Sequence, residues 1–505
     1  GANSVAGNTV LGESALDSGS LSGGNNTAIG KQALTALTSG SSNTSVGFDS
    51  LAATTTGSDN IGIGSKSLFT NSTGSNNVAI GVSALRNSTG DDNTAIGRSA
   101  LFANTSGTSN VGLGKNVLAA NTTASNNTAV GNAALTANTT GTRNTAVGTN
   151  ALDANTTGND NIAIGVDTLG VNTTGQLNVA VGDFSLDANT TGDANTAFGH
   201  GSLGANTTAN NNTAVGYHSL LSNTTGTENV AVGTNALANN TTASDNVAVG
   251  RGSLGTNTTG ADNVAVGRSA LANNTTASNN TAVGKSALLV NTTGVNNVAV
   301  GSGALDANTT GANNTVVGYN SAGGLTTGNQ NVFIGENCGI VATTGNTNTC
   351  CGRDSGGQLT TGSNNLLLGH DAGKSGSPLH VTSGSNNIVL GDNNITSANV
   401  KVDWTVSSDQ RDKTDIQDIT TGLDFVKQLK PKSFWFKKDR DSDVKHGDKK
   451  YGFLAQDILA LEGSDPVVIN NKDEDSLKYQ GSHLIPILVN AIKELSAKVT
   501  ALEAG

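Results

Sequence analysis

The side chains most able to bind a metal or act as nucleophiles are few and scattered in this sequence. Cys350 and Cys351 occupy positions at which other copies of an internal repeat carry Ala and Val. We therefore expect small core hydrophobes there rather than a disulfide or a metal site. No metal-ligand spacing links the six histidines, which are His200, His218, His370, His380, His446 and His483. The sequence predicts no metal and no cofactor.

Polysaccharide cleavage is a second chemistry to consider. It needs two carboxylates that face each other across a groove. The first 400 residues offer six Phe, two Tyr and isolated Asp residues at varying positions of the repeat. This pattern argues against a carbohydrate-degrading enzyme, a hypothesis that would require activity of the purified protein against a host polysaccharide.

The composition departs from that of a globular enzyme. Of 505 residues, 13% are charged, 3% are aromatic and 66 are Gly, and Met is absent. An ordinary chain of this length forms about three domains with large apolar cores, whereas this core must consist of small side chains. The absence of Met leads us to expect that an initiator has been removed or that an upstream attachment region is missing.

The charge distribution argues against two kinds of partner and predicts a boundary. The net charge is −11, and the first 400 residues hold only 11 Lys and Arg, so the clustered cations that phosphate binding requires are lacking. No run approaches the ~18 apolar residues of a membrane span. We expect neither nucleic-acid binding nor membrane insertion. Residues 401–505 carry 34 charged residues against 31 in residues 1–400, which predicts a domain boundary near residue 400.

A 17-residue repeat organises residues 8–391. Its 23 copies contain the element Asn-(Thr/Val)-Ala-Val-Gly, in which the Asn lies four residues before the Gly in every copy, from Asn8 to Asn387. An apolar residue precedes each of these glycines, and Leu follows four residues after it in the 18 copies from Leu16 to Leu305. An Asn-Thr-Thr-Gly turn usually completes the unit.

The alternation around Thr145, Ala146 and Val147 is typical of a short strand, and the Gly and the Asn-Thr-Thr-Gly tract supply turns. We predict that each repeat forms one coil of a parallel β-solenoid. One Val, one Leu and a Thr or Val per coil cannot offset backbone ordering at about 1–2 kcal/mol per residue, so coils must stack. A spacing of ~4.8 Å gives a rod about 105 Å long, along which the asparagines form a ladder of bonded amides.

The Ala between the two apolar strand positions must face the other way. In water Ser or Thr would serve as well, so the preference for Ala suggests close approach by another chain and predicts a homotrimer. The repeat resembles the head repeats of trimeric autotransporter adhesins and the collar and fibre repeats of phage proteins. In the last copies we expect the cross-section to change, because Leu is replaced there by Ala322, Gly339, Gly356 and Gly373.

Four ordered motifs lie in the last 100 or so residues. The first is Val406-Ser407-Ser408-Asp409-Gln410-Arg411-Asp412-Lys413-Thr414-Asp415-Ile416. The others are Gly422-Leu423 with Leu429-Lys430-Pro431, then Tyr451-Gly452-Phe453-Leu454-Ala455-Gln456-Asp457, then Tyr479 with Leu488-Val489-Asn490-Ala491-Ile492-Lys493-Glu494-Leu495. Together they resemble the endosialidase-type intramolecular chaperone, the peptidase S74 family found at the ends of phage tailspikes and fibres.

This resemblance implies a trimerising module that assists folding of the preceding fibre and then cuts itself off. The bond cut would be Ser407–Ser408. Lys413 matches the base of the family's Ser-Lys dyad, in which a buried Lys takes the proton of the hydroxyl, here that of Ser408. Asp409 and Arg411 match the motif as well, although a structural ion pair explains them equally. The only enzymatic activity expected is this serine-lysine autoproteolysis, which acts on the chain itself.

The last segment contains a heptad seam of apolar residues, which are Ile485, Leu488, Ile492, Leu495, Val499 and Leu502. Identical coils can pair in a register that is wrong by one repeat, and three chains must agree on one register before the core closes. A coiled coil at one end would align them. In isolated peptides this residue pattern favours dimers, but we let the family resemblance decide for a trimer.

We therefore predict a mainly β protein with a homotrimeric β-solenoid shaft over residues 1–400, a small α+β chaperone domain over residues 401–484 and a coiled-coil helix over residues 485–505. Its predicted role is that of a viral tail fibre or tailspike on the virion that binds a host cell-surface receptor, a glycan or a surface protein. Receptor contacts are expected at the variable pair after each repeat glycine, such as Tyr217-His218. The alternative is a bacterial surface adhesin or extracellular filament without autoproteolysis.

Overall fold

The computed structural model describes residues 5–401, 407–437, 443–471 and 477–505. The chain forms two compact units, Gly1–Leu390 and Gly391–Gly505. Val406, which opens the first motif, lies outside the described residues. Among the described residues, no helix has the length and apolar character of a membrane span.

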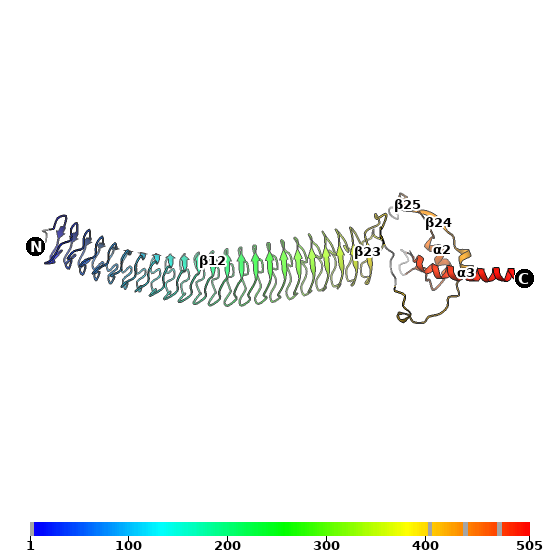
Figure 1. Ribbon diagram of the computed structural model, residues 1–505, viewed down its shortest axis with the longest axis horizontal. Helices are drawn as coiled ribbons and strands as arrows, with labels where there is room; N and C mark the ends of the chain where they lie inside the picture. Colours follow the sequence, from blue (N-terminus) through cyan, green and yellow to red (C-terminus); the bar gives the residue numbers. More distant parts are fainter. Residues whose placement is uncertain (1–4, 402–406, 438–442, 472–476) are drawn as a thin grey trace. The chain divides into compact units, whose positions relative to one another are not determined.

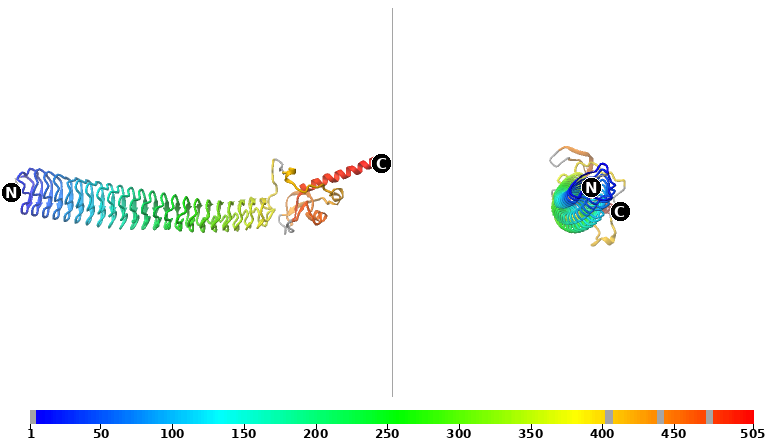
Figure 2. Two further views of the ribbon diagram at one scale, coloured as in Figure 1. Left: turned by 90° about the horizontal axis from the view of Figure 1, so that it is seen from below. Right: turned by 90° about the vertical axis from the view of Figure 1, so that its left-hand side faces the viewer.

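The first unit is a β-solenoid of 17-residue coils, as predicted (Figure 1). Each coil contributes one three-residue strand that ends just before the repeat glycine, and successive strands pair in parallel. In β9 and β10, for example, Ala146 lies opposite Ala163, one repeat further along the chain. Figure 2 shows the same stack of coils from below and from its N-terminal end.

The strands of this sheet are β1 (Thr9–Leu11), β2 (Thr27–Ile29), β3 (Thr44–Val46), β4 (Ile61–Ile63), β5 (Val78–Ile80), β6 (Thr94–Ile96), β7 (Val111–Leu113), β8 (Thr128–Val130), β9 (Thr145–Val147), β10 (Ile162–Ile164), β11 (Val179–Val181), β12 (Thr196–Phe198), β13 (Thr213–Val215), β14 (Val230–Val232), β15 (Val247–Val249), β16 (Val264–Val266), β17 (Thr281–Val283), β18 (Val298–Val300), β19 (Thr315–Val317), β20 (Val332–Ile334), β21 (Thr349–Cys351), β22 (Leu366–Leu368) and β23 (Ile388–Leu390).

The strands face the opposite way from the prediction. The middle residue, such as Ala146, is fully buried, whereas its neighbours Thr145 and Val147 are only half-buried. Leu152 of the same coil is also fully buried, and a Leu in so narrow a cross-section leaves room for little more than a methyl group opposite it. The Ala therefore packs inside its own chain. The inference that Ala marks contact with another chain was wrong, and so was the expected core of Val, Leu and Thr.

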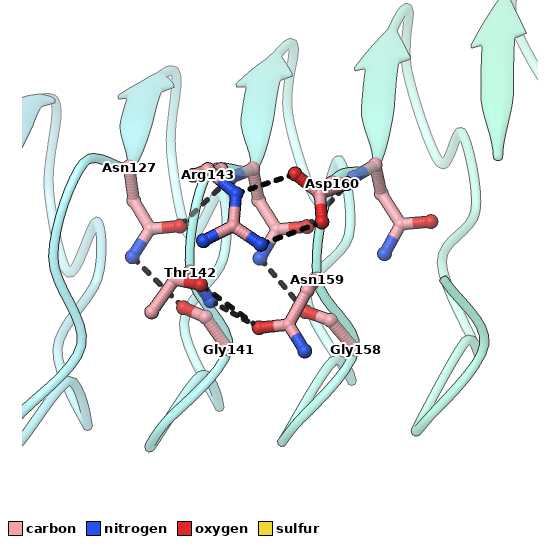
Figure 3. A network of polar contacts seen from close by, with 9 residues as sticks. Asn127, Gly141, Thr142, Arg143, Gly158, Asn159 and Asp160 are labelled. Atoms are coloured by element: carbon pink, nitrogen blue, oxygen red, sulfur yellow. Dashed lines mark hydrogen bonds and ion pairs between the residues drawn. The ribbon is translucent and has the colours of Figure 1, made fainter. Parts of the chain in front are cut away.

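The predicted asparagine ladder is confirmed. The backbone N–H of Asn144 donates to Oδ1 of Asn127 at 2.9 Å, and the side-chain amide of Asn127 donates to the carbonyl of Gly141 at 2.9 Å (Figure 3). The amides also bond directly, as from Nδ2 of Asn178 to Oδ1 of Asn161 at 3.2 Å. Each buried amide thus satisfies backbone groups of two coils, which is why no other residue replaces it.

A second ladder, which the sequence analysis missed, runs through the Asn-Thr-Thr-Gly turns from Asn104 to Asn308. Nδ2 of Asn138 donates to Oδ1 of Asn121 at 2.9 Å and to the carbonyl of Gly141, three residues ahead, at 2.9 Å. The Thr that follows each Asn bonds the next coil, as from Oγ1 of Thr139 to the carbonyl of Thr156 at 3.0 Å. The regular recurrence of this Asn was the available signal.

In the last coils, a larger side chain in the middle of the strand fills the core space that Leu occupies elsewhere. Gly339 replaces Leu, and the ring of Phe333, fully buried in the middle of β20, fills the space: a Cβ on Gly339 would lie 2.5 Å from that ring. Leu367 of β22 likewise packs over Gly356 and Gly373. Core volume is therefore kept by exchanging large and small positions, while the strands retain their parallel register.

The prediction for the two neighbouring cysteines was half wrong. Cys350 is fully buried, in the middle position of β21, but Cys351 is exposed because the last strand position faces outward. A hydrogen bond with the Cys338 thiol, and then burial, raise the pKa of the Cys350 thiol. All three cysteines are free thiols.

The second unit contains η1 (Gln410–Asp412), α1 (Leu423–Gln428), β24 (Lys432–Lys437), β25 (Lys445–Gly452), α2 (Ala455–Glu462), β26 (Ile469–Asn470), β27 (Lys478–Tyr479) and α3 (Gly481–Glu503). Strands β24 and β25 form one antiparallel pair, and β26 and β27 form another. A small core joins α2, β26 and α3 through Ile458, Val468, Ile469, Leu484 and Ile487. The unit is thus a small α+β fold that ends in a helix.

The ladder makes a testable prediction for one coil. Asn178→Ala removes the donors to Asn161 and Gly192 and the acceptor for Asn195. Because buried partners are left unsatisfied at about 1–3 kcal/mol each, we expect a clearly lower melting temperature by circular dichroism. Asn239→Ala, at an exposed position, is the matched control. Equal melting of the two variants would contradict a stabilising role for the ladder.

Candidate functional site

The segment that follows Ser407 is a tight turn built around Asp409. The Asp409 carboxylate accepts a hydrogen bond from the backbone N–H of Arg411 at 2.9 Å and thereby caps η1. The Arg411 guanidinium lies 2.6 Å from the same carboxylate. Hydrogen bonds from the Arg411 side chain, and then from its backbone, hold the pKa of Asp409 below its usual range. The ion pair therefore shapes the turn, which is the structural role the motif allowed.

This turn brings Lys413 over Ser408. Nζ of Lys413 lies 2.8 Å from Oγ of Ser408 and 3.0 Å from the Ser408 carbonyl oxygen. Oγ of Ser407 donates to the carboxylate of Asp412 at 3.4 Å. The five predicted site residues thus lie in one turn, together with Asp412, to which the sequence analysis assigned no role.

The geometry places a hydroxyl within hydrogen-bonding distance of an amine. An amine can take the proton of a serine hydroxyl when burial disfavours its charged form. Ser408 and Lys413 are both exposed in the single chain. Ser408 and Lys413 are therefore as close as a nucleophile and its base need to be. In a single chain, however, no surrounding residues bury the Lys413 amine.

Two further motifs meet at Glu494. Its carboxylate accepts from the backbone N–H of Leu423 at 2.9 Å and from the side-chain amide of Asn490 at 3.2 Å. Asn490 in turn donates to the carbonyl of Thr421 at 3.1 Å. A Cβ on Gly422 would overlap the Glu494 carboxylate and would displace this side chain from its two donors. These motif residues attach the start of α1 to α3 and have a structural role.

Helix α3 has two apolar faces. Leu484, Ile487 and Ala491 are buried against the rest of the unit. The predicted heptad seam lies on other positions and is exposed along its whole length: Ile492 has an exposed fraction of 67% and Leu502 of 81%. An amphipathic helix whose second apolar stripe faces water is typical of a coiled-coil strand without its partners.

One group of possible metal ligands exists among the described residues of the solenoid, namely Asp354, His370 and Asp371. Lys374 lies 2.8 Å from Asp371, and Arg353 pairs with Asp354 at 3.4 Å. Arg353 also lies 2.8 Å from Nε2 of His370. Two cationic side chains therefore occupy the surroundings in which a metal ion would have to bind, and the group is an ion-pair network.

The β-solenoid thus precedes a small α+β unit that begins with a turn pairing Ser408 and Lys413. Residues 408–464 match the Peptidase_S74 family, described as chaperone of endosialidase. The C-terminal unit therefore carries a domain of this family, and the match begins at Ser408. The motif residues from Tyr479 to Leu495 lie beyond the matched segment. No curated protein matches the chain.

The junction at Glu494 can be tested through stability. Glu494→Ala removes the acceptor of Leu423 and Asn490, and Gly422→Ala introduces an overlapping Cβ. Each should lower the free energy of unfolding of the second unit by about 1–3 kcal/mol, measured from the fluorescence of its tryptophans in urea. Glu503→Ala at the exposed end of α3 is the control. Unchanged midpoints for both site variants would contradict the assignment.

Proposed function

We propose that this chain is a homotrimeric viral fibre or tailspike component. We assign residues 1–400 to a rigid shaft, residues 401–484 to a chaperone domain and residues 485–505 to a coiled-coil clamp. The observation that carries the proposal is the match of residues 408–464 to the endosialidase chaperone family directly after a β-solenoid. Such a protein would act on the virion, where the shaft carries contacts to a host cell-surface receptor.

The need for a chaperone follows from the shaft itself. Each strand offers the next the same short pattern, so a coil that pairs one repeat out of register still finds an Asn and a buried Ala. Such errors are slow to correct in parallel sheets, whose contacts lie far apart in sequence. A domain that aligns three chains at one end removes the ambiguity, since all coils then stack from a common start.

Two apolar surfaces support a trimer. One is the exposed seam of α3. The other, which we term the outer stripe, consists of the first and last residues of the solenoid strands β1 to β23, all of them Thr, Val, Ile, Leu, Phe or Cys. Ile162 and Ile164 are 39% and 40% exposed, and Phe198 is 54% exposed. An apolar surface that runs through every coil exceeds what monomers normally expose, and identical chains side by side would cover it.

The proposed autoproteolysis uses Ser408 and Lys413. Oγ of Ser408 adds to the carbonyl carbon of Ser407 as its proton passes to the Lys413 amine. The C–N bond between Ser407 and Ser408 then breaks, the proton passes to the leaving nitrogen, and an ester remains between the Ser407 acyl group and the Ser408 oxygen. Water hydrolyses this ester to a carboxylate at Ser407 and a free amine at Ser408. Assembly of three chains would supply the burial that the base requires.

Self-cleavage is tested by two substitutions. Ser408→Ala removes the nucleophile, and Lys413→Arg keeps the charge but not the ability to act as a base. Both should keep the fragment from Ser408 to Gly505 attached on a denaturing gel, whereas Ser407→Ala, which leaves the dyad intact, should still release it. Identical bands for all proteins would contradict autoproteolysis and favour the alternative, an adhesin or filament that does not cut itself.

Trimerisation is tested at the exposed seam. Ile492→Glu with Leu495→Glu places charges where the helices would pack, so light scattering should report the mass of a single chain rather than of three. The same variant should remain uncut, because the dyad stays exposed. Ala497→Glu, on the outer side of the heptad, should leave the mass unchanged. A trimeric seam variant, or a wild-type protein that is monomeric in solution, would contradict the proposal.

A further inference from the structure

Four aromatic rings gather on one corner of the solenoid, where the chain turns after the repeat glycine. The rings of Tyr217 and His218 stack with centroids 3.8 Å apart, and His200 stacks on Tyr217 at 5.7 Å. Phe184 meets His200 edge-on at 5.7 Å. Phe184 and Tyr217 remain 42% and 51% exposed. In an array with so few aromatic residues, this cluster leaves about half of two aromatic side chains exposed to water.

Packing of the coil does not explain the cluster. Phe184 and His218 occupy the second position after the repeat glycine, and their φ angles are 58° and 53°. A left-handed backbone favours Asn, Asp or Gly and costs free energy with a ring-bearing side chain. Other coils place Asn150 or Asn235 there. Still other coils place Lys66 or Ala133 there, so the coil itself does not require a ring at this position.

A hollow of about 440 Å³ lies beside these rings. It exists because the coil between Phe184 and His218 carries Gly201 and Gly204 where its neighbours carry side chains, and a Cβ on Gly201 would lie 2.8 Å from the His218 ring. The volume falls within the ~300–1,000 Å³ range of small-molecule sites. The two glycines thus form part of the floor, and Phe184, His200 and His218 line the hollow together with aliphatic and polar side chains.

The charges around the hollow are negative. Asp187 lines the hollow. Burial, and to a lesser extent repulsion from Asp167, raises the pKa of the Asp187 carboxyl. The sequence holds no Lys or Arg between Arg143 and Arg251. An anionic ligand would therefore be repelled, whereas hydroxyl groups can donate to Asp187 and bond the imidazole nitrogens.

We propose that the cluster of Phe184, His200, Tyr217 and His218 is a binding site for a neutral sugar, a pyranose unit of a cell-surface glycan. One face of a pyranose carries C–H hydrogens with a small positive charge, which pack on the negative faces of aromatic rings, and its edge carries hydroxyls for Asp187 and the histidines. The inference rests on the proposed adhesive fibre and names its receptor class.

The test uses the full-length protein on an array of neutral oligosaccharides of glucose, galactose and mannose, with sialylated and uronic-acid oligosaccharides beside them. We expect wild type to bind neutral members only. Phe184→Ala with Tyr217→Ala should weaken that binding by about tenfold, the effect of losing two ring contacts. Tyr319→Ala is the matched control, because Tyr319 follows Gly318 as Tyr217 follows Gly216 and is 56% exposed.

Three results would overturn this site: no binding of wild type to any neutral oligosaccharide, binding to anionic ones alone, or undiminished binding of the double variant. The last would place adhesion elsewhere on the shaft and leave the fibre proposal intact. The same preparations, run on a denaturing gel and by light scattering, report cleavage and trimerisation separately, so failure of the glycan site is distinguishable from failure of the fibre itself.

Discussion

Every coil of the solenoid depends on its neighbours to satisfy its buried amides. Oδ1 of Asn178 accepts from the backbone and the side chain of Asn195, and Nδ2 of Asn178 reaches back to Asn161. An isolated coil would leave these groups unpaired, and an unpaired buried polar group costs more than a made hydrogen bond contributes. The array is therefore stable only as a stack, and its stability grows with each interface rather than within a coil.

The same dependence makes register the difficult step of folding. The ladder specifies that Asn meets Asn but not which Asn, since every coil presents the same amide at the same place. Local irregularities help to mark position: Asn308 ends the second ladder because the next coil carries Leu325, and Phe333 fits only over Gly339. Such marks lie toward both ends of the array, because the second ladder also begins only at Asn104, after coils that carry Leu37, Thr54 and Ser88 at the equivalent position. The uniform coils between them carry no comparable mark of their register.

The repeat and the first ladder could be predicted because Asn and Gly recur at the same positions of every copy. Which side of the strand faces the core could not be predicted, because Thr145, Ala146 and Val147 alternate over only three residues and either side can be apolar. Leu152 settles the orientation, because it is buried in the same core cluster as Ala146, and this shared burial depends on the tertiary structure. At the candidate site, the pairing of Ser408 with Lys413 was suggested by family resemblance, whereas the exposure of both depends on what the surrounding chain covers.

The contacts inside the solenoid also determine which repeat positions can change to bind a ligand. The Asn, the Gly and the buried Ala or Leu are fixed by contacts with the coils on either side, so a change there disturbs several interfaces at once. The residues directly after the repeat glycine contact mainly the equivalent corner of adjacent coils, as Tyr217 and His200 do. Substitutions at this corner leave both ladders intact. A solenoid can thus acquire a ring cluster over a few coils without losing the stack that displays it, which separates the evolution of binding from that of folding.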